Sequence, residues 1–252
     1  MRILLFLSIL LPYTSTFAYS LITKTVEWHK VRVFHIPKND DYRVSIAARN
    51  EATSLKSLIQ EGGAVAGING AYFTPKDYTG KPDSTNTIRI IWGEGKKYSE
   101  YFPDTGVNGL FWFLKNWTPM LLQNNIWGNK NIRMNLNSEK IWDIYYWIAN
   151  FPILLMSGVN VIPKYIDAGI ITEKMRAKAV KSFICRTKEN DIKMGTISSI
   201  SIVDVPLFIK QFGCVDAINL DSGGSLALYD TWKYIIWPGR NIMDAFIIKK
   251  KE

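Results

Sequence analysis

A short segment in the last third of the chain places residues that carry chemistry at the end of an apolar run. Residues 216–225 read Asp-Ala-Ile-Asn-Leu-Asp-Ser-Gly-Gly-Ser. Because side chains alternate along a strand, Asn219 and Asp221 project from the same face, so an amide and a carboxylate meet at the strand's end. Gly223 and Gly224 let the backbone approach a ligand and direct N–H groups at it. A bare polar turn would use the same residue types, but a carboxylate in this position favours a ligand site.

A second segment also ends an apolar strand in a polar turn. Residues 64–73 read Ala-Val-Ala-Gly-Ile-Asn-Gly-Ala-Tyr-Phe. Asn-Gly is a turn signal, and asparagine tolerates left-handed backbone geometry. Alone, this pair is typical of an ordinary hairpin turn. Since both segments end in a polar residue and glycine, we expect Asn69 and Asp221 to face one cleft. Their side chains should lie within about 10 Å, close enough to be bridged by a sugar ring or a water-mediated contact.

Four segments of the chain together resemble the phosphodiester glycosidase family. Residues 219–225 are similar to its Asn-Leu-Asp-Gly-Gly-Gly-Ser signature, and residues 64–73 to its Ala-Val-Ala-Gly-Ile-Asn-Gly-Gly-Phe-Phe segment. Residues 152–158 resemble Gly-Pro-x-Leu-x-x-Asn/Asp-Gly, and residues 240–246 resemble Arg-x-Val-x-Asn-Ala-Leu. The segments follow the family's order, and the resemblance extends from about Val31 to the C-terminus.

The resemblance implies a hydrolase that cuts a sugar-1-phosphate diester at the anomeric carbon, on an envelope or extracellular glycan. An ordinary glycosidase needs a carboxylic acid to protonate an alkoxide leaving group. A phosphomonoester leaves more readily, because its second pKa is about 6. One central carboxylate therefore suffices, and the resemblance assigns that role to Asp221, as base or nucleophile. Asn219 and Asn69 would complete the catalytic set by orienting sugar hydroxyls.

The substrate-binding residues that the resemblance implies are backbone donors, one hydroxyl and basic side chains. The backbone N–H donors and the hydroxyl belong to Gly70, Gly223, Gly224 and Ser225. Arg240 is the candidate phosphate clamp, assisted by Lys181 or Arg176, because a guanidinium binds phosphate through two parallel hydrogen bonds. A salt bridge that holds the last strand is the structural alternative for Arg240.

Several positions depart from the family's pattern. Ser222 replaces a glycine, Ala71-Tyr72 replaces Gly-Phe, and Ser157 replaces Asn or Asp. Where the family has Arg-Thr-Ala-Ile-Gly, residues 181–185 read Lys-Ser-Phe-Ile-Cys. Lysine lacks the two-pronged geometry of arginine. These departures leave a second function open, that of a catalytically inactive module that binds glycan or envelope through the same cleft.

An exported esterase is a third class of function. Ser225 does not lie in a nucleophile elbow of the Gly-x-Ser-x-Gly type. The chain has only two histidines, His29 and His35, to serve as base. Both fall in a predicted strand, where a lone histidine is more often structural than catalytic. The sequence therefore favours the glycosidase over the esterase.

The N-terminus has the pattern of a secretory signal. Arg2 precedes an apolar run, Ile3–Leu11, and small residues lead to Thr16-Phe17-Ala18. We expect cleavage after Ala18, with Ser20 as the second choice, and a secreted or periplasmic product. A membrane anchor is the alternative, but the apolar run is far shorter than the roughly 20 residues that span a bilayer. No later apolar stretch is long enough either, so no stable membrane insertion is expected after cleavage.

Charge and metal-binding residue types restrict the partners. The formal net charge is +9, which favours anionic partners. Export and the absence of a recognition motif argue against nucleic acid. Cys185 and Cys214 either pair in an oxidising compartment or remain as two buried thiols. The two cysteines and the two histidines together are too few and too badly spaced for a zinc site. No cofactor is expected, although Asp221 and nearby carbonyls are oxygen ligands of the kind that bind a divalent cation.

The elements that position these residues are mostly strands. Alternating or β-branched apolar runs predict strands at 26–36, 42–48, 64–68, 87–92, 110–114, 153–156, 181–185, 192–197, 215–220, 226–229, 233–237 and 242–248. Helices are predicted at 53–60 and from the N-cap Asp204 to Gly213. Residues 138–149 fit either a helix capped by Ser138 or an aromatic-rich strand. We therefore expect one α+β domain over residues 19–252, with a mixed β-sheet core and short packed helices.

Overall fold

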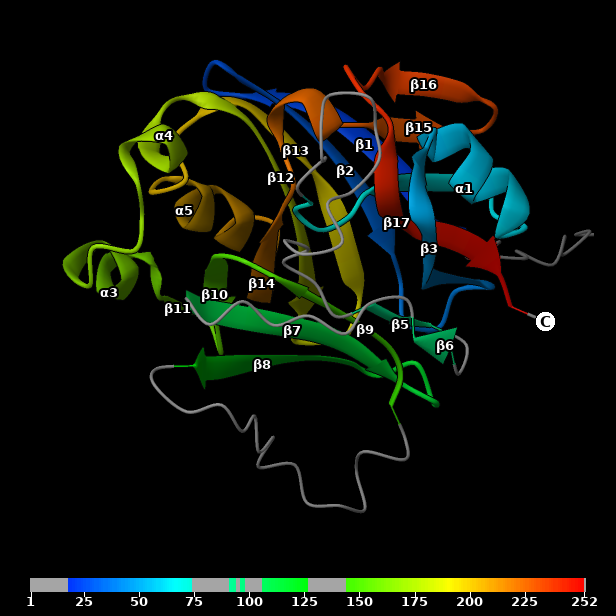
Figure 1. Cartoon of the computed structure of the whole chain (residues 1–252), viewed down its shortest axis with the longest axis horizontal. Coiled ribbons are helices and arrows are strands. Elements are labelled where there is room, and N and C mark those ends of the chain that lie inside the picture. Colours follow the sequence, from blue (N-terminus) through cyan, green and yellow to red (C-terminus); the bar gives the residue numbers. More distant parts are fainter. Residues whose placement is uncertain (1–17, 74–90, 94–95, 98–105, 127–143, 252) are drawn as a thin grey trace, which may run out of the picture.

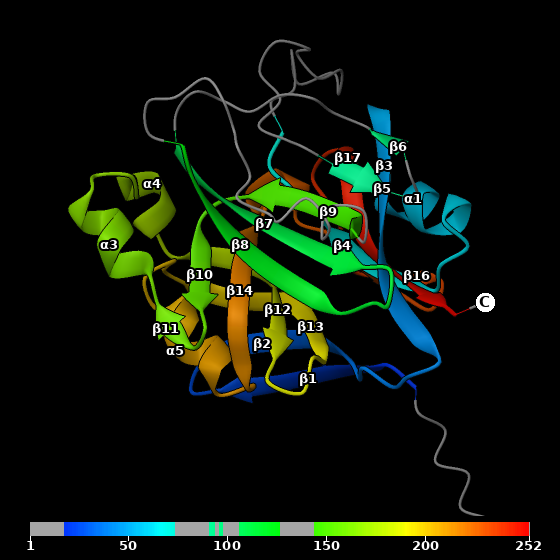
Figure 2. The same ribbon diagram turned by 90° about the horizontal axis from the view of Figure 1, so that it is seen from below.

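Three β-sheets make up most of the molecule in a computed structural model of the chain (Figures 1 and 2). The structure describes residues 18–73, 91–93, 96–97, 106–126 and 144–251. Every strand pair in those ranges is antiparallel. The core is therefore built from antiparallel sheets, and the expectation of a mixed sheet is wrong for the described part of the chain.

Each sheet draws its strands from distant parts of the chain. In spatial order, the first sheet consists of β1 (Ser20–Val26), β2 (His29–Ile36), β13 (Ile192–Ile200), β12 (Ala179–Thr187), β14 (Cys214–Leu220), β10 (Ile153–Met156) and β11 (Val159–Asn160). The second consists of β16 (Lys233–Ile236), β15 (Leu228–Asp230), β4 (Ala66–Asn69), β17 (Ile242–Lys250) and β3 (Tyr42–Thr53). The third consists of β6 (Lys96–Lys97), β5 (Ile91–Gly93), β9 (Ile144–Asn150), β7 (Gly106–Leu114) and β8 (Pro119–Ile126).

The helices are short and lie outside the sheets. In the described part of the chain they are α1 (Leu55–Glu61), α3 (Ile162–Asp167), α4 (Glu173–Arg176), α5 (Val205–Lys210) and the 3₁₀ turn η1 (Gly223–Ser225). Figure 2 shows α3, α4 and α5 on one side of the molecule and α1 on the other. No helix among the described residues is long and apolar enough to cross a bilayer.

The central strands of the first sheet carry buried residues on both faces, whereas the edge strand β1 is largely exposed. Along β2, Val31 and Val33 belong to the core that α3 and α5 cover, whereas Phe34 and Ile36 belong to the core between the sheets. A third, smaller core lies between α1 and the second sheet. The molecule is thus a single, mainly β domain, which confirms the expected α+β class only in part.

The structure decides two questions that the sequence left open, the element formed by residues 144–149 and the state of the two cysteines. Residues 144–150 form the strand β9, because β5 and β7 hydrogen-bond to its two edges and override the helical spacing. Residues 138–143 lie outside the described residues, as do most of the predicted strand at 87–92 and residues 1–17 of the predicted signal. Cys185 and Cys214 form a disulfide with Cα atoms 5.7 Å apart.

The predicted strand at 26–36 is in fact a hairpin. Val26 pairs with His29, so Glu27 and Trp28 form a two-residue turn between β1 and β2. Glu27 has a left-handed φ of 56°. Such turns normally contain glycine or asparagine. Because this turn contains neither, it carries no recognisable turn signal in the sequence.

Candidate active site

Asp221 lies directly after β14, and three neighbouring segments fix its backbone. Its N–H donates to the carbonyl of Gly70 at 2.9 Å. Its carbonyl accepts from Asn69 Nδ2 at 2.5 Å and from Ser182 Oγ at 2.6 Å. Both lone pairs of that carbonyl are therefore used. Because β4, β12 and β14 all hold the backbone of this residue, its side chain is kept in a fixed position.

The carboxylate of Asp221 is buried but polar in its surroundings. The residue is 4% exposed. Oδ1 accepts from the N–H of Ser222 at 2.8 Å, and Arg240 Nη2 lies 3.4 Å from Oδ2. Burial raises the pKa of Asp221, and the nearby charge of Asp244 adds to this. A hydrogen bond from Ser225, the charge of Arg240 and the Ser222 N–H act against the rise.

Arg240 joins three parts of the site. Its Nε donates to Ser225 Oγ at 2.7 Å. Its guanidinium lies over the ring of Phe73, 4.8 Å from the centroid. With 31% of its side chain exposed, it remains open to an anionic ligand while it pairs with Asp221. The structural partner of Arg240 is thus the candidate catalytic carboxylate.

Asn219 lies near the end of β14, two residues before Asp221. Its Nδ2 donates to the hydroxyl of Tyr72 at 2.6 Å and to the carbonyl of Leu220 at 2.8 Å. Its Oδ1 is buried and has no hydrogen-bond partner among the described residues. A buried amide oxygen without a partner is costly, so it is suited to accept a hydrogen bond from a ligand.

Asn69 lies next to Asp221, which confirms the expected proximity, but both polar atoms of its amide bond to the backbone. Besides donating to the Asp221 carbonyl, it accepts from the N–H of Ala227 through Oδ1 at 3.0 Å. The residue is 1% exposed. Its observed contacts therefore hold the loop rather than face a ligand.

Gly70 supports the site through its backbone. Its N–H donates to the carbonyl of Asp244 at 3.0 Å. The expectation that this N–H lines the substrate site is therefore wrong, because its one proton is taken. A Cβ at this position would lie 2.0 Å from Asp244 Oδ1. The glycine is thus required by close packing against β17.

The turn after Asp221 brings Arg240 to the site. Gly223 has a φ of 65° and, like Gly224, is exposed. The N–H of Gly239 donates to the carbonyl of Gly224 at 2.8 Å, which ties the segment before β17 to η1. Ser222, which replaces a family glycine, places its hydroxyl 3.3 Å from Ser182 Oγ.

Lys181 and Arg176 are not drawn into this network. Ser182 pairs with Leu220, so Lys181 occupies the next position, beside Asp221. Its Nζ nevertheless donates to the carbonyl of Met175 on α4 at 3.1 Å, and burial lowers its pKa. Arg176 is exposed on the same helix. Among the described residues, no hydrogen bond or ion pair joins Lys181 or Arg176 to Asp221.

Four further residues belong to the site and were missed in the sequence. Ser182 and Tyr72 hydrogen-bond to Asp221 and Asn219 respectively, and Asp244 accepts the N–H of Ala71 at 2.7 Å through Oδ1. Asn150 donates to the carbonyl of Asn219 at 2.8 Å and accepts from the N–H of Tyr72 at 3.3 Å. Asn150 ends an apolar strand, as Asn69 does, and that signal could have found it. The described residues contain no group of three His, Cys, Asp or Glu side chains placed to hold a metal ion.

Comparison with solved structures identifies proteins of the same fold. Among solved structures, the catalytic domain of zebrafish N-acetylglucosamine-1-phosphodiester alpha-N-acetylglucosaminidase, auto-inhibited by its pro-peptide, has the same fold. The TM-score is 0.67 at 17% identity, over 93% of this chain and 83% of that one. A hypothetical protein from Synechocystis is similar with a TM-score of 0.57 at 13% identity, over 92% of this chain and 62% of that one. No curated protein matches the sequence significantly.

The sequence also matches the model of a protein family. It covers residues 62–249, which include β4, β14, η1 and all but the last residue of β17, together with Asn69, Asp221 and Arg240. More than half of the chain lies within that match. The chain belongs to the phosphodiester glycosidase family.

Proposed function

We propose that this chain is an exported glycosidase that hydrolyses a sugar-1-phosphate diester at the anomeric carbon. The observation that carries the proposal is the pair formed by Asp221 and Arg240. A buried carboxylate and a partly exposed guanidinium lie 3.4 Å apart between Oδ2 and Nη2. Family membership supports the same chemistry.

In the proposed reaction, Arg240 binds the phosphate and Asp221 acts at the sugar. The phosphate competes with Asp221 for the guanidinium, so substrate binding loosens the ion pair and frees the carboxylate. As a base, Asp221 accepts a proton from the water whose oxygen bonds to the anomeric carbon. As a nucleophile, it forms that bond itself, and water then releases the sugar. In both cases the carbon–oxygen bond to phosphate breaks, and the phosphomonoester leaves without needing an acid partner.

The neighbouring residues fit supporting roles. The amide oxygen of Asn219, buried and without a partner among the described residues, accepts a sugar hydroxyl. Asn69 acts as a positioning residue that holds Asp221 through its carbonyl. Ser225 links the two charged groups, because it accepts from Arg240 and donates to Asp221.

The test is a screen of sugar-1-phosphate diesters, run in water enriched in ¹⁸O, with Asp221→Asn as the blank. Attack at the anomeric carbon places the label in the sugar. Label in the phosphate would contradict the proposal, because it would identify a phosphodiesterase. Binding of the diesters without any turnover would instead identify an inactive glycan-binding module.

A further inference from the structure

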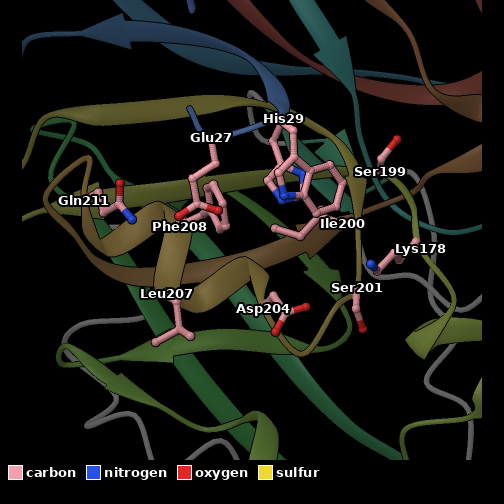
Figure 3. A pocket seen from close by; sticks show the side chains of 11 residues that line it. Glu27, His29, Lys178, Ser199, Ile200, Ser201, Asp204, Leu207, Phe208 and Gln211 are labelled. Atoms are coloured by element: carbon pink, nitrogen blue, oxygen red, sulfur yellow. The ribbon is translucent and has the colours of Figure 1, made fainter. Parts of the chain in front are cut away.

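A pocket separate from the Asp221 site opens beside the β1–β2 turn. It has a volume of about 400 Å³ and is bordered by that turn, the end of β13 and α5 (Figure 3). Its lining combines aromatic rings with carboxylate, amide, hydroxyl and ammonium groups. None of these residues takes part in the contacts described around Asp221.

Two irregularities of the backbone shape this pocket. Glu27 turns the chain in the left-handed region, and the next residue, Trp28, lines the pocket. On β13, Ile197 pairs with Lys181 but Ile200 pairs with Ala179, so β13 bulges by one residue. Ser199, within the bulge, has a φ of 52°. A bulge re-aims the side chains around it, and Ser199 is brought into the lining.

Trp28 presents a flat apolar surface at this pocket. It is 58% exposed, unusual for so large an apolar ring. The His29 ring lies against one face, with the centroids 3.7 Å apart, and Phe208 in turn packs edge-on against His29 at 4.6 Å. His29 Nδ1 lies 2.7 Å from the carbonyl of Ser198, which anchors the stack to β13. Lys178 Nζ also lies over the Trp28 ring, 5.0 Å from its centroid, and the lysine side chain is exposed, so a ligand can displace it.

The polar groups that line the pocket together with Trp28 are of the kinds that bind sugar hydroxyls. Glu27 and Asp204 provide carboxylate acceptors, and Gln211 provides an amide that both donates and accepts. All three are exposed. A rigid aromatic face for the C–H side of a sugar ring, with planar polar groups beside it, matches a sugar better than a purely charged or purely apolar ligand.

The pocket and Asp221 lie at the same end of the first sheet. Lys181 lies beside Asp221, Ala179 pairs with Ile200, and Val26 pairs with His29. The strand order β14-β12-β13-β2 separates the two places by three strand spacings, about 14 Å in total. A single sugar ring cannot span that distance, whereas a short oligosaccharide can.

The segment between the two places is basic. Lys174, Arg176 and Lys178 are all exposed there. Met175 of this segment accepts the hydrogen bond from Lys181. A glycan that runs from Asp221 toward Trp28 would pass these cations, which suits a chain that carries phosphate.

We propose that the Trp28 pocket is a distal subsite that binds a sugar unit of the same glycan chain whose phosphodiester is cut at Asp221. This inference rests on the proposed function for its link to Asp221, and it names the substrate class as an oligosaccharide or polysaccharide rather than a small diester. Trp28 acts through binding and touches none of the reacting atoms.

The first test measures binding alone, so it does not depend on catalysis. Glucose and N-acetylglucosamine oligomers of one to six units are titrated against the wild type, Trp28→Ala and Trp232→Ala by calorimetry. Trp232 is a matched control, because it is 76% exposed and also follows the first residue of a two-residue hairpin turn. We expect Trp28→Ala to weaken oligomer binding by at least about tenfold, the scale of one lost aromatic contact. Trp232→Ala should have no effect.

The second test measures the link to the reaction. The methyl phosphodiester of N-acetylglucosamine 1-phosphate is compared with diesters that carry a tetrasaccharide on either side of the phosphate. Trp28→Ala should lower kcat/KM about tenfold for one of the long diesters and leave the methyl diester within about twofold. Gln211→Ala should show the same preference with a smaller loss, which guards against a folding defect in the first variant.

The outcomes separate this inference from the proposed function. If Trp28→Ala binds every oligomer as the wild type does, or lowers kcat/KM equally for long and short diesters, the subsite does not exist. If no diester is hydrolysed but oligomers still bind through Trp28, the proposed function fails and the sugar pocket stands without its link to catalysis.

Discussion

Asn69 Nδ2 lies 2.5 Å from the backbone carbonyl of Asp221, although 152 residues separate the two in the chain. The same amide accepts the N–H of Ala227. One side chain from β4 thus holds both ends of the loop that carries the candidate catalytic carboxylate. The position of Asp221 is therefore a property of the packed sheets and not of its own loop alone.

Replacing Asn69 should destabilise the protein. Asn69→Ala leaves a buried carbonyl with one partner fewer and a buried N–H with none, so we expect a loss of about 2 to 4 kcal/mol in the free energy of unfolding. Asn69→Asp should fare no better, because a carboxylate cannot donate to the Asp221 carbonyl. Gln60→Ala, on the exposed side of α1, should change stability by less than about 0.5 kcal/mol. Urea unfolding measures all three, and a fully stable Asn69→Ala would contradict the positioning role.

The pKa of Asp221 predicts a pH-dependent stability. Burial raises that pKa, so the folded protein binds the proton more tightly than the unfolded chain does. The stabilisation by the protonated form is complete below the ordinary value of about 3.9 and is lost as the pH rises through the higher folded value. Asp221→Asn mimics the neutral form, so it should unfold at a higher temperature than the wild type at pH 7. The gap should close as the pH falls toward 4, and a variant that is less stable at pH 7 would contradict the argument.

Arg240→Lys should separate phosphate binding from sugar chemistry. Lysine keeps the charge but loses the bond from Nε to Ser225 and the two-pronged geometry. We expect kcat/KM on a phosphodiester to fall by about tenfold or more, the scale of a charge-assisted hydrogen bond. A nitrophenyl glycoside, which has no phosphate, should lose less. Equal losses on both substrates would show that Arg240 acts through Asp221 alone and that the phosphate is bound elsewhere.

The exported form should begin at Tyr19. Its hydroxyl donates to Asp230 Oδ1 at 3.0 Å, and its ring packs against Phe34 and Tyr42 with centroids 6.1 and 5.0 Å apart. Cleavage after Ala18 keeps these contacts, whereas cleavage after Ser20 removes them. N-terminal sequencing of protein recovered outside the cytoplasm is the measurement. Retention of Met1 in membrane-bound protein would reverse the expectation.

The residues that mark strand ends were visible in the sequence, whereas their partners were not. Asn69 and Asp221 stand out because each breaks an apolar run. Ser182 lies inside an apolar strand, and only the register of β12 against β14 carries it to the Asp221 carbonyl. Lys181 is the opposite case. The strand register places it beside Asp221, but its ammonium group donates to the carbonyl of Met175 on α4 instead. These hydrogen-bond partners depend on which segments pack together in the folded protein. No local pattern in a single sequence shows that packing.

The activity of Asp221→Asn on a sugar-1-phosphate diester tests the central claim most directly. Asparagine keeps the shape of the side chain and an oxygen to accept the Ser222 N–H, so the fold should persist, which circular dichroism and the unfolding temperature will show. Asp41→Asn, at an exposed position, is the matched control. We predict a loss of turnover of at least about 10²-fold for Asp221→Asn, the scale of a general acid–base group, and none for Asp41→Asn. A folded Asp221→Asn protein with wild-type turnover would show that the catalytic carboxylate has been misassigned.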